Sequence, residues 1–397
     1  MRRNFKYTMF ACYIGYLTQA IIINYAPLLY VTFQTSLGLT LSQISFLIAV
    51  NFGTQMLTDI GSSPIVERIG HRAAAVLSQV LCSLGMLGFA LLPAWMPNTP
   101  YLAILIPTVI CGVGGGLIEV MVSPILEACP TQHKSAHMSL LHSFYCWGQA
   151  CAVLISTLLF LVFGIESWQV IAAVWAIIPL ADAVLFALVP INDLVKEGEG
   201  ETRRQLLSRP LFWAMMGLMV CSGASEIIMA QWASSFAETG LGVSKAVGDL
   251  LGPCLFALLM GTARIISAAL STRMSLYKLM SGSCALCILS YLIAVFAPNP
   301  IVSLLGCALC GLAVGSLWPG TFSIASKQIP RGGFPMFAIL AFCGDIGCMS
   351  GPTIAGQIAA ATGGDLKAAF LFALIFPVCA LVILWRVRKK PDKISQG

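Results

Sequence analysis

Charged side chains are scarce in this sequence. Asp, Glu, Lys and Arg make up 10% of its 397 residues, whereas a soluble domain carries about a quarter. Hydrophobic residues make up 58%, and the mean hydropathy is +0.89. This balance excludes a soluble globular protein and predicts an all-α polytopic membrane protein in a lipid bilayer. The net charge of +6 indicates no nucleic-acid partner, because the basic residues lie in short loops.

The sequence also lacks motifs for enzyme chemistry, cofactors and metals. The spacing of Cys284 with Cys287, and of Cys307 with Cys310, falls in apolar runs without neighbouring His or acidic residues. We interpret these cysteines as small apolar packing residues, not as metal ligands or disulfides. The glycines of 112–116 follow no strand and precede no Lys-Ser or Lys-Thr pair, so they form no nucleotide-binding loop. We therefore expect no enzyme activity, no metal and no cofactor.

Long apolar runs recur along the whole chain. A helix needs about 20 such residues to cross a hydrocarbon core about 30 Å thick. Hydropathy predicts twelve spans, at residues 8–32, 44–65, 73–92, 101–128, 138–163, 168–190, 211–236, 248–270, 277–297, 301–325, 334–360 and 367–386. The first run is too long for a signal peptide and lacks a small-residue cleavage site, so we expect it to remain as a helix.

The distribution of basic residues predicts the orientation. With twelve spans both termini share one side, and 19 of the 22 Lys and Arg residues fall on that side. Two fall in the opposite loops, and Arg264 lies within a span. Since cytoplasmic loops carry the excess of Lys and Arg, we expect both termini in the cytoplasm and the chain in the cell membrane.

One stretch divides the chain into two halves. Residues 191–209 hold its densest charge and no apolar run, which predicts a cytoplasmic linker between an N-terminal six-helix bundle, 1–190, and a C-terminal one, 210–397. The halves share short echoes at nearly constant spacing: Gly53-Thr54 with Gly261-Thr262, and Cys111-Gly112 with Cys310-Gly311. Six plus six spans in the same orientation indicate a parallel repeat.

The segment after the second span carries a recognisable motif. It reads PIVERIGHR from Pro64 to Arg72 and resembles the loop signature of the major facilitator superfamily, an Asp-Arg-x-Gly-Arg-Arg string. Glu67 stands at the Asp position, Arg68 and Gly70 match, and His71 replaces one Arg. The chain is thus similar to that superfamily over its whole length. The resemblance implies twelve helices in two pseudo-symmetric bundles, a functional monomer, and a small-molecule substrate moved by alternating access.

The fourth span resembles one subfamily more closely. Its string GGGLIEVMVSP, which contains Glu119, is similar to the fourth helix of the fucose:proton symporter-like sugar transporters, with Ser123 in place of an Asn. The segments 140–144 and 223–232 resemble helices five and seven of that group. The group also uses an acid on helix one, where this chain has Thr18, Gln19 and Asn24. Proton symport is the implied mechanism, and uncoupled facilitated diffusion stays open.

Three charged residues lie at similar depth in their spans. Counting about 1.5 Å per residue, Glu119, Arg264 and Asp345 lie about 14–17 Å from the cytoplasmic ends. A charge this deep is costly, so such residues are candidates for a substrate or proton site facing a central cavity. A structural ion-pair network is the alternative, and Arg264 should pair with Asp345 or Glu119.

Further polar, acidic and aromatic residues complete the candidate site. Asn51, Gln55 and Asp59 form a stripe on the second span, where Asp59 either lines the cavity or stabilises the loop signature of Glu67, Arg68, Gly70 and Arg72. We expect Asp182 to belong to a packing network. The other candidates lie on spans one, five, seven and ten: Gln19, Asn24, His142, Gln149, Glu226, Gln231, Trp232 and Trp318.

Two functions compete on these residues. The mixture of amides, Trp rings and isolated carboxyl groups favours uptake of a neutral sugar, polyol or glycoside, with the proton gradient as energy source. The aromatic and Met content, with no acid on helix one, favours proton-antiport efflux of an amphipathic drug or metabolite. A membrane sensor has little support, because the linker of about 20 residues is too short for a signalling domain.

Overall fold

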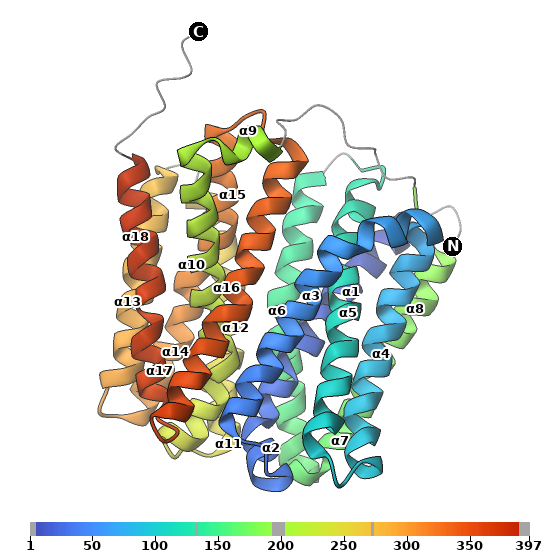
Figure 1. Ribbon diagram of the computed structural model, residues 1–397, viewed down its shortest axis with the longest axis vertical. Helices are drawn as coiled ribbons and strands as arrows, with labels where there is room; N and C mark the ends of the chain where they lie inside the picture. Colours follow the sequence, from blue (N-terminus) through green and yellow to red (C-terminus); the bar gives the residue numbers. More distant parts are fainter. Residues whose placement is uncertain (1–4, 132–133, 193–202, 271–273, 389–397) are drawn as a thin grey trace. The chain divides into compact units, whose positions relative to one another are not determined.

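The computed structural model describes residues 5–131, 134–192, 203–270 and 274–388, and its regular elements are helices (Figure 1). In chain order they are α1 (Phe5–Asn24), α2 (Tyr30–Leu37), α3 (Leu41–Ile69), α4 (His71–Trp95), α5 (Pro100–Glu127), α6 (Lys134–Phe163), α7 (Trp168–Trp175), α8 (Ile177–Leu188), α9 (Arg203–Leu207), α10 (Pro210–Ser235), α11 (Lys245–Asp249), α12 (Leu255–Leu270), α13 (Leu276–Phe296), α14 (Pro300–Val314), α15 (Leu317–Gln328), α16 (Gly333–Ala361), α17 (Leu366–Ala373) and α18 (Ile375–Arg388). The predicted all-α membrane class is confirmed.

The helices follow the predicted spans. Eleven helical stretches in the described residues are long and apolar enough to cross a membrane. They match every predicted span except the second, residues 44–65, which lies within the 29-residue helix α3. The polar stripe of Asn51, Gln55 and Asp59 lowers the hydropathy of α3 without shortening it.

Several spans consist of two helices because a proline near the start of the second helix interrupts the backbone hydrogen bonds that would join it to the first. Proline has no N–H and its ring clashes with the carbonyl one turn earlier. The helix pairs α1 and α2, α7 and α8, α14 and α15, and α17 and α18 are interrupted in this way, and α11 runs into α12 through a π-helical turn. The corresponding prolines are Pro27, Pro179, Pro319, Pro377 and Pro253.

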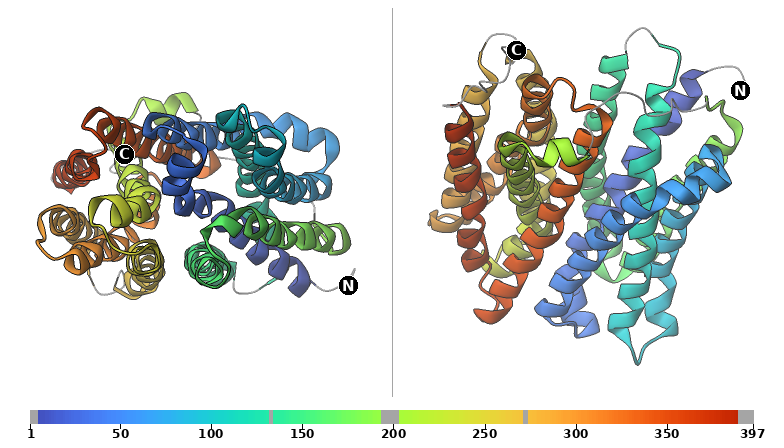
Figure 2. Two further views of the ribbon diagram at one scale, coloured as in Figure 1. Left: turned by 90° about the horizontal axis from the view of Figure 1, so that it is seen from below. Right: turned by 45° about the horizontal axis from the view of Figure 1, so that its top comes forward.

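The chain forms two compact units. Unit 1 contains Met1–Val195 together with Ser244–Leu250, and unit 2 contains Lys196–Val243 and Leu251–Gly397. Within each unit the long helices run up and down along one direction (Figures 1 and 2). Of the predicted linker, 191–209, the residues 193–202 lie outside the described part, and α9 follows them.

A short segment from the second half of the sequence packs in unit 1. Lys245 on α11 forms an ion pair with Asp249 at 3.1 Å and donates to the carbonyl oxygen of Leu28. Asp249 is fully buried and accepts a 3.1 Å hydrogen bond from the hydroxyl of Thr157 on α6. The hydrogen bonds to Leu28 and Thr157 hold α11 against the rest of unit 1, and the ion pair lies within α11.

Helix α5, which carries Glu119, contacts several other helices of unit 1. It packs along α3 and α4 and also contacts α1 and α6. Pro107 and Pro124 lie inside it without ending it. In unit 2, α10 has a similar place, since it packs along α16 and α18.

Candidate functional site

Two glycines of α5 allow neighbouring helices to come unusually close. A Cβ at Gly115 would lie 3.0 Å from Oε1 of Gln19 on α1, and one at Gly116 would lie 2.7 Å from the backbone carbonyl oxygen of Gln55 on α3. Ordinary contact begins at 3.4 Å. A larger residue at Gly116 would therefore push the backbone of α3 away, whereas at Gly115 it would meet side-chain atoms that can shift. Close approach at small residues is a common way for membrane helices to pack.

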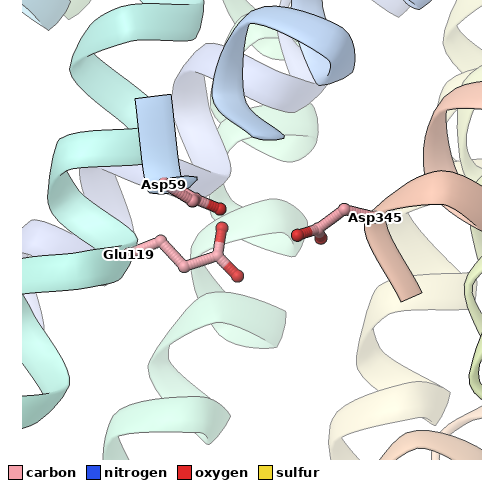
Figure 3. A group of neighbouring side chains, drawn as sticks. All are labelled: Asp59, Glu119 and Asp345. Atoms are coloured by element: carbon pink, nitrogen blue, oxygen red, sulfur yellow. The ribbon is translucent and has the colours of Figure 1, made fainter. Parts of the chain in front are cut away.

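This packing brings two carboxyl groups together. Asp59 extends from α3 and Glu119 from α5, and their side chains point toward one another (Figure 3). An oxygen of one lies within 4.8 Å of an oxygen of the other. Oδ1 of Asp59 is buried without a hydrogen-bond partner in the described part of the chain, and a Cβ at Gly116 would lie 3.0 Å from it. Two negative charges this close repel strongly at low dielectric, so a proton or another cation must neutralise part of the charge.

An amide pair lies beside the acids. Nε2 of Gln19 donates a 2.8 Å hydrogen bond to Oε1 of Gln55, and both side chains are buried. The remaining amide atoms, Oε1 of Gln19 and Nε2 of Gln55, have no partner among the described residues, and neither has Oδ1 of Asn51. The pair thus offers one acceptor and one donor to a further group.

Helices α5 and α6 contribute polar and aromatic contacts to α1. The hydroxyl of Tyr16 shares a 3.0 Å hydrogen bond with that of Ser123, and its ring meets the ring of His142 edge to face at 5.5 Å. Ser123, which replaces an Asn in the resembling sugar transporters, therefore joins α5 to α1. Gln149 is buried on α6, and its Nε2 has no partner in the described residues.

The candidates Asn24 and Trp232 make helix contacts. Nδ2 of Asn24 donates to the carbonyl oxygen of Ala20 one turn earlier, at 2.9 Å. Trp232 is fully buried on α10, and its Nε1 donates to the carbonyl oxygen of Pro352 on α16 at 2.9 Å. In the structure Trp232 therefore joins two helices of unit 2, and its part in substrate binding stays a prediction.

Unit 2 holds a second group of charged candidates. Glu226 and Gln231 are buried on α10, and the charge of Arg264 on α12 acts on Glu226. The tip of the Trp318 ring on α15 lies only 2.1 Å from the position that a Cβ at Gly344 would take. The ring therefore packs against α16 just before Asp345. Asp345 is partly buried on that helix (Figure 3).

The structure assigns the charged candidates to different units. Glu119 belongs to unit 1, whereas Arg264 and Asp345 belong to unit 2. The predicted meeting of all three at one cavity stays a prediction. Within unit 2, Glu226 is an acidic neighbour of Arg264, a pairing that the sequence did not suggest.

The loop signature is organised by a turn and an arginine. Gly70 has φ of +82°, which favours glycine, and it separates α3 from α4. Nη1 of Arg72 donates to the carbonyl oxygens of Phe186 and Ala187 at 3.1 and 2.8 Å, so a cation caps the end of α8. Arg68 is exposed, and the side chain of Glu67 lies outside the described part.

Sequence reasoning missed the partner of Glu119 and expected a network around Asp182 that the hydrogen bonds do not show. The partner was sought on helix one, but the structure has it on α3 as Asp59. The expected packing network around Asp182 is wrong, because neither of its oxygens has a hydrogen-bond partner in the described residues. Asp59 had a usable signal, since it continues the stripe of α3 that faces the glycines of α5.

These features define a multi-pass membrane protein of transporter architecture. The profile of the Major Facilitator Superfamily matches residues 9–336, and the chain belongs to this superfamily.

Comparison with known proteins supports the fold. A bacterial homologue of the human lysosomal transporter Spinster is 13% identical with a TM-score of 0.78, covering 98% of both chains. A D-xylose-proton symporter is 16% identical with a TM-score of 0.74, covering 96% of both. The fucose:proton symporter of E. coli is 17% identical with a TM-score of 0.63, covering 97% of this chain and 98% of that one.

A sequence relative covers part of the chain. "Membrane protein MosC" of Rhizobium meliloti is 30% identical over 171 residues, which are 43% of this chain. The match spans 41% of that relative's length. It shows shared ancestry of that region, and its name states a location and no substrate.

Proposed function

We propose that this protein is a secondary transporter that takes up a small neutral polyhydroxylated solute together with protons, by alternating access. The observation that supports it best is the pairing of Asp59 with Glu119 inside helices that cross the membrane. Ionisable groups at that depth are costly and therefore usually functional. On the charge bias of its loops, both termini lie in the cytoplasm and the chain lies in the cell membrane.

The carboxyl pair supplies a proton carrier. With two negative charges the pair is strongly disfavoured, whereas with one shared proton it holds a single charge. The site can therefore gain a proton from the side to which it is open and release it to the other side. This arrangement replaces the helix-one acid of the resembling sugar transporters with the acid Asp59 on α3.

The amide pair of Gln19 and Gln55 supplies the hydrogen-bonding groups for the solute. A hydroxyl group both donates and accepts, so it can donate to Oε1 of Gln19 and accept from Nε2 of Gln55. Both atoms are buried and without a partner among the described residues, and a buried amide gains most from a bond it otherwise lacks. The names of two structural neighbours, a D-xylose-proton symporter and a fucose:proton symporter, are consistent with a sugar as substrate.

Uptake by purified protein in liposomes tests this function. A panel of radiolabelled neutral sugars, beginning with D-xylose and fucose, is presented with and without an inwardly directed proton gradient. We expect at least one sugar to accumulate above its outside concentration and a protonophore to abolish that accumulation. Proton-driven export of a cationic dye, with no sugar accumulated, would instead assign the protein to the efflux class.

A pair of variants tests the solute contact. Gln55→Leu removes the amide donor and acceptor at nearly constant size, and we expect it to raise the KM for sugar at least about tenfold, as one or two lost buried hydrogen bonds imply. Glu166→Gln, at an exposed residue in the turn between α6 and α7, is the control and should leave the KM unchanged.

A further inference from the structure

A cavity at one end of unit 1 is not used by the proposed function. It lies between the start of α4 and the end of α8 and has a volume of about 690 Å³. Pockets that hold ligands in proteins have volumes of about 300–1,000 Å³. The lining is polar where α4 begins and apolar further along that helix: His71, Arg72 and Asn192, then Val76, Leu77 and Val80.

The polar end of the cavity lies at the border of the bilayer. The apolar span predicted at residues 73–92 begins directly after Arg72, and α8 ends at Leu188. Val80 follows Arg72 by eight residues, which is about 12 Å along α4. The cavity therefore extends from the level of the lipid headgroups into the hydrocarbon core.

The apolar end of the cavity is continuous with a surface that faces lipid. Leu77, Leu84 and Leu91 recur every seventh residue on α4, and they are 37%, 50% and 43% exposed. Residues at this spacing share one face of a helix, and an exposed apolar face on a spanning helix contacts acyl chains. Because Leu77 belongs both to this face and to the cavity lining, a lipid can enter the cavity from the bilayer.

The polar end carries a positive charge without an acidic partner. Nη1 of Arg72 donates to the carbonyl oxygens of Phe186 and Ala187, which are neutral acceptors. In the described part of the chain, Nε and Nη2 of Arg72 make no hydrogen bond and no ion pair, and none of the lining residues is acidic. A guanidinium presents its N–H groups as a planar fork that matches the oxygens of a phosphate.

We propose that this cavity binds an anionic phospholipid, whose phosphate contacts Arg72 and whose acyl chain lies along Val76, Leu77 and Val80. A free phosphate compound would use only the polar end, whereas a phospholipid uses both ends. On the orientation inferred from the loop charges, the cavity lies in the cytoplasmic leaflet, which carries the anionic lipids. The bound lipid stabilises the contact of α4 with α8, because Arg72 already joins these helices.

Lipid binding to the purified full chain, stripped of lipid in detergent, tests the proposal. Native mass spectrometry measures the affinity for the first bound lipid, with phosphatidylglycerol and phosphatidylcholine of the same acyl chains as probes. We expect phosphatidylglycerol to bind at least about tenfold more tightly, as one hydrogen bond between charged groups implies. It should also raise the unfolding temperature, whereas inorganic phosphate at the same concentration should neither do so nor displace the lipid.

Two variants with controls locate the site. Arg72→Gln removes the charge and keeps N–H donors for the α8 carbonyls, so the preference for phosphatidylglycerol should be lost. Arg68→Gln removes an exposed charge of the same loop signature outside the cavity lining and should keep that preference. Ala73→Trp fills the cavity with the charge retained and should weaken phosphatidylglycerol binding at least about tenfold. Ala181→Trp, at an exposed alanine of α8 outside the lining, should bind like the wild type.

Three results would overturn the proposal. The first is equal affinity of the wild-type protein for the two lipids, and the second is an equal loss of preference in Arg68→Gln and Arg72→Gln, which would indicate diffuse charge. The third is displacement of phosphatidylglycerol by an equal concentration of inorganic phosphate, which would indicate a site for a small soluble anion. If Arg72→Gln does not fold, Ala73→Trp decides, and unchanged phosphatidylglycerol binding by that variant refutes the site.

Discussion

A methyl group added at Gly116 would collide with α3 at the turn that carries Asp59. The new Cβ would lie 2.7 Å from the carbonyl oxygen of Gln55 and 2.8 Å from Cβ of Thr58. Ordinary contact begins at 3.4 Å, so the backbone of α3 would have to move about 0.7 Å away. The obstacle is backbone, which cannot rotate aside as a flexible side chain can.

We expect Gly116→Ala to lower stability by about 1–3 kcal/mol, the usual cost of overpacking a well-packed core. It should also weaken proton coupling, because Asp59 moves relative to Glu119. Gly61→Ala is the control, since this glycine lies on α3, the helix that faces Gly116, with nothing within 4 Å of the added atom. That variant should be neutral or slightly stabilising, as alanine favours helix.

The assay is thermal unfolding in detergent, followed by tryptophan fluorescence, and sugar accumulation in liposomes. If Gly116→Ala unfolds at the same temperature as Gly61→Ala and accumulates sugar normally, α3 does not approach α5 as closely as described. The role given to the glycines would then be wrong.

Other contacts give further tests of stability, each read out as a shift in unfolding temperature. Asp249→Ala leaves Lys245 without its carboxylate and should cost up to about 3–5 kcal/mol. Thr157→Val removes one hydrogen bond to that carboxylate and should cost about 1.5–3 kcal/mol. The reverse order would contradict an ion pair with a buried carboxylate. Trp232→Phe loses the bond to the Pro352 carbonyl and should cost about 0.5–1.5 kcal/mol, and an unchanged unfolding temperature would contradict that bond.

Much of the fold could be predicted because bilayer crossing leaves a local signal. About 20 apolar residues in a row identify a spanning helix without any knowledge of its neighbours, and the helices agree with the predicted spans. The second span, α3, kept enough apolar residues around its polar stripe to be recognised. Prolines such as Pro179 and Pro377 explain where spans divide into two helices.

The pairing of side chains could not be predicted, because it depends on which helices meet. Asp59 and Glu119 are 60 positions apart, and only the face that α5 turns to α3 decides that they meet. The glycines at 115 and 116 indicated close packing but not the partner of each. The packing of α11 in unit 1 had no local signal either, since Lys245 and Asp249 bond to groups far away in sequence.

Accumulation and exchange measured on the same Glu119→Gln liposomes test the coupling claim most directly. Removing the acid leaves no pair to share a proton, but it preserves the size of the side chain and the amide pair of Gln19 and Gln55. We predict that the variant exchanges labelled for unlabelled sugar across the membrane while losing accumulation against the sugar gradient. Sugar accumulation by Glu119→Gln at the wild-type level, under the same proton gradient, would contradict the assignment of this carboxyl pair as the proton carrier.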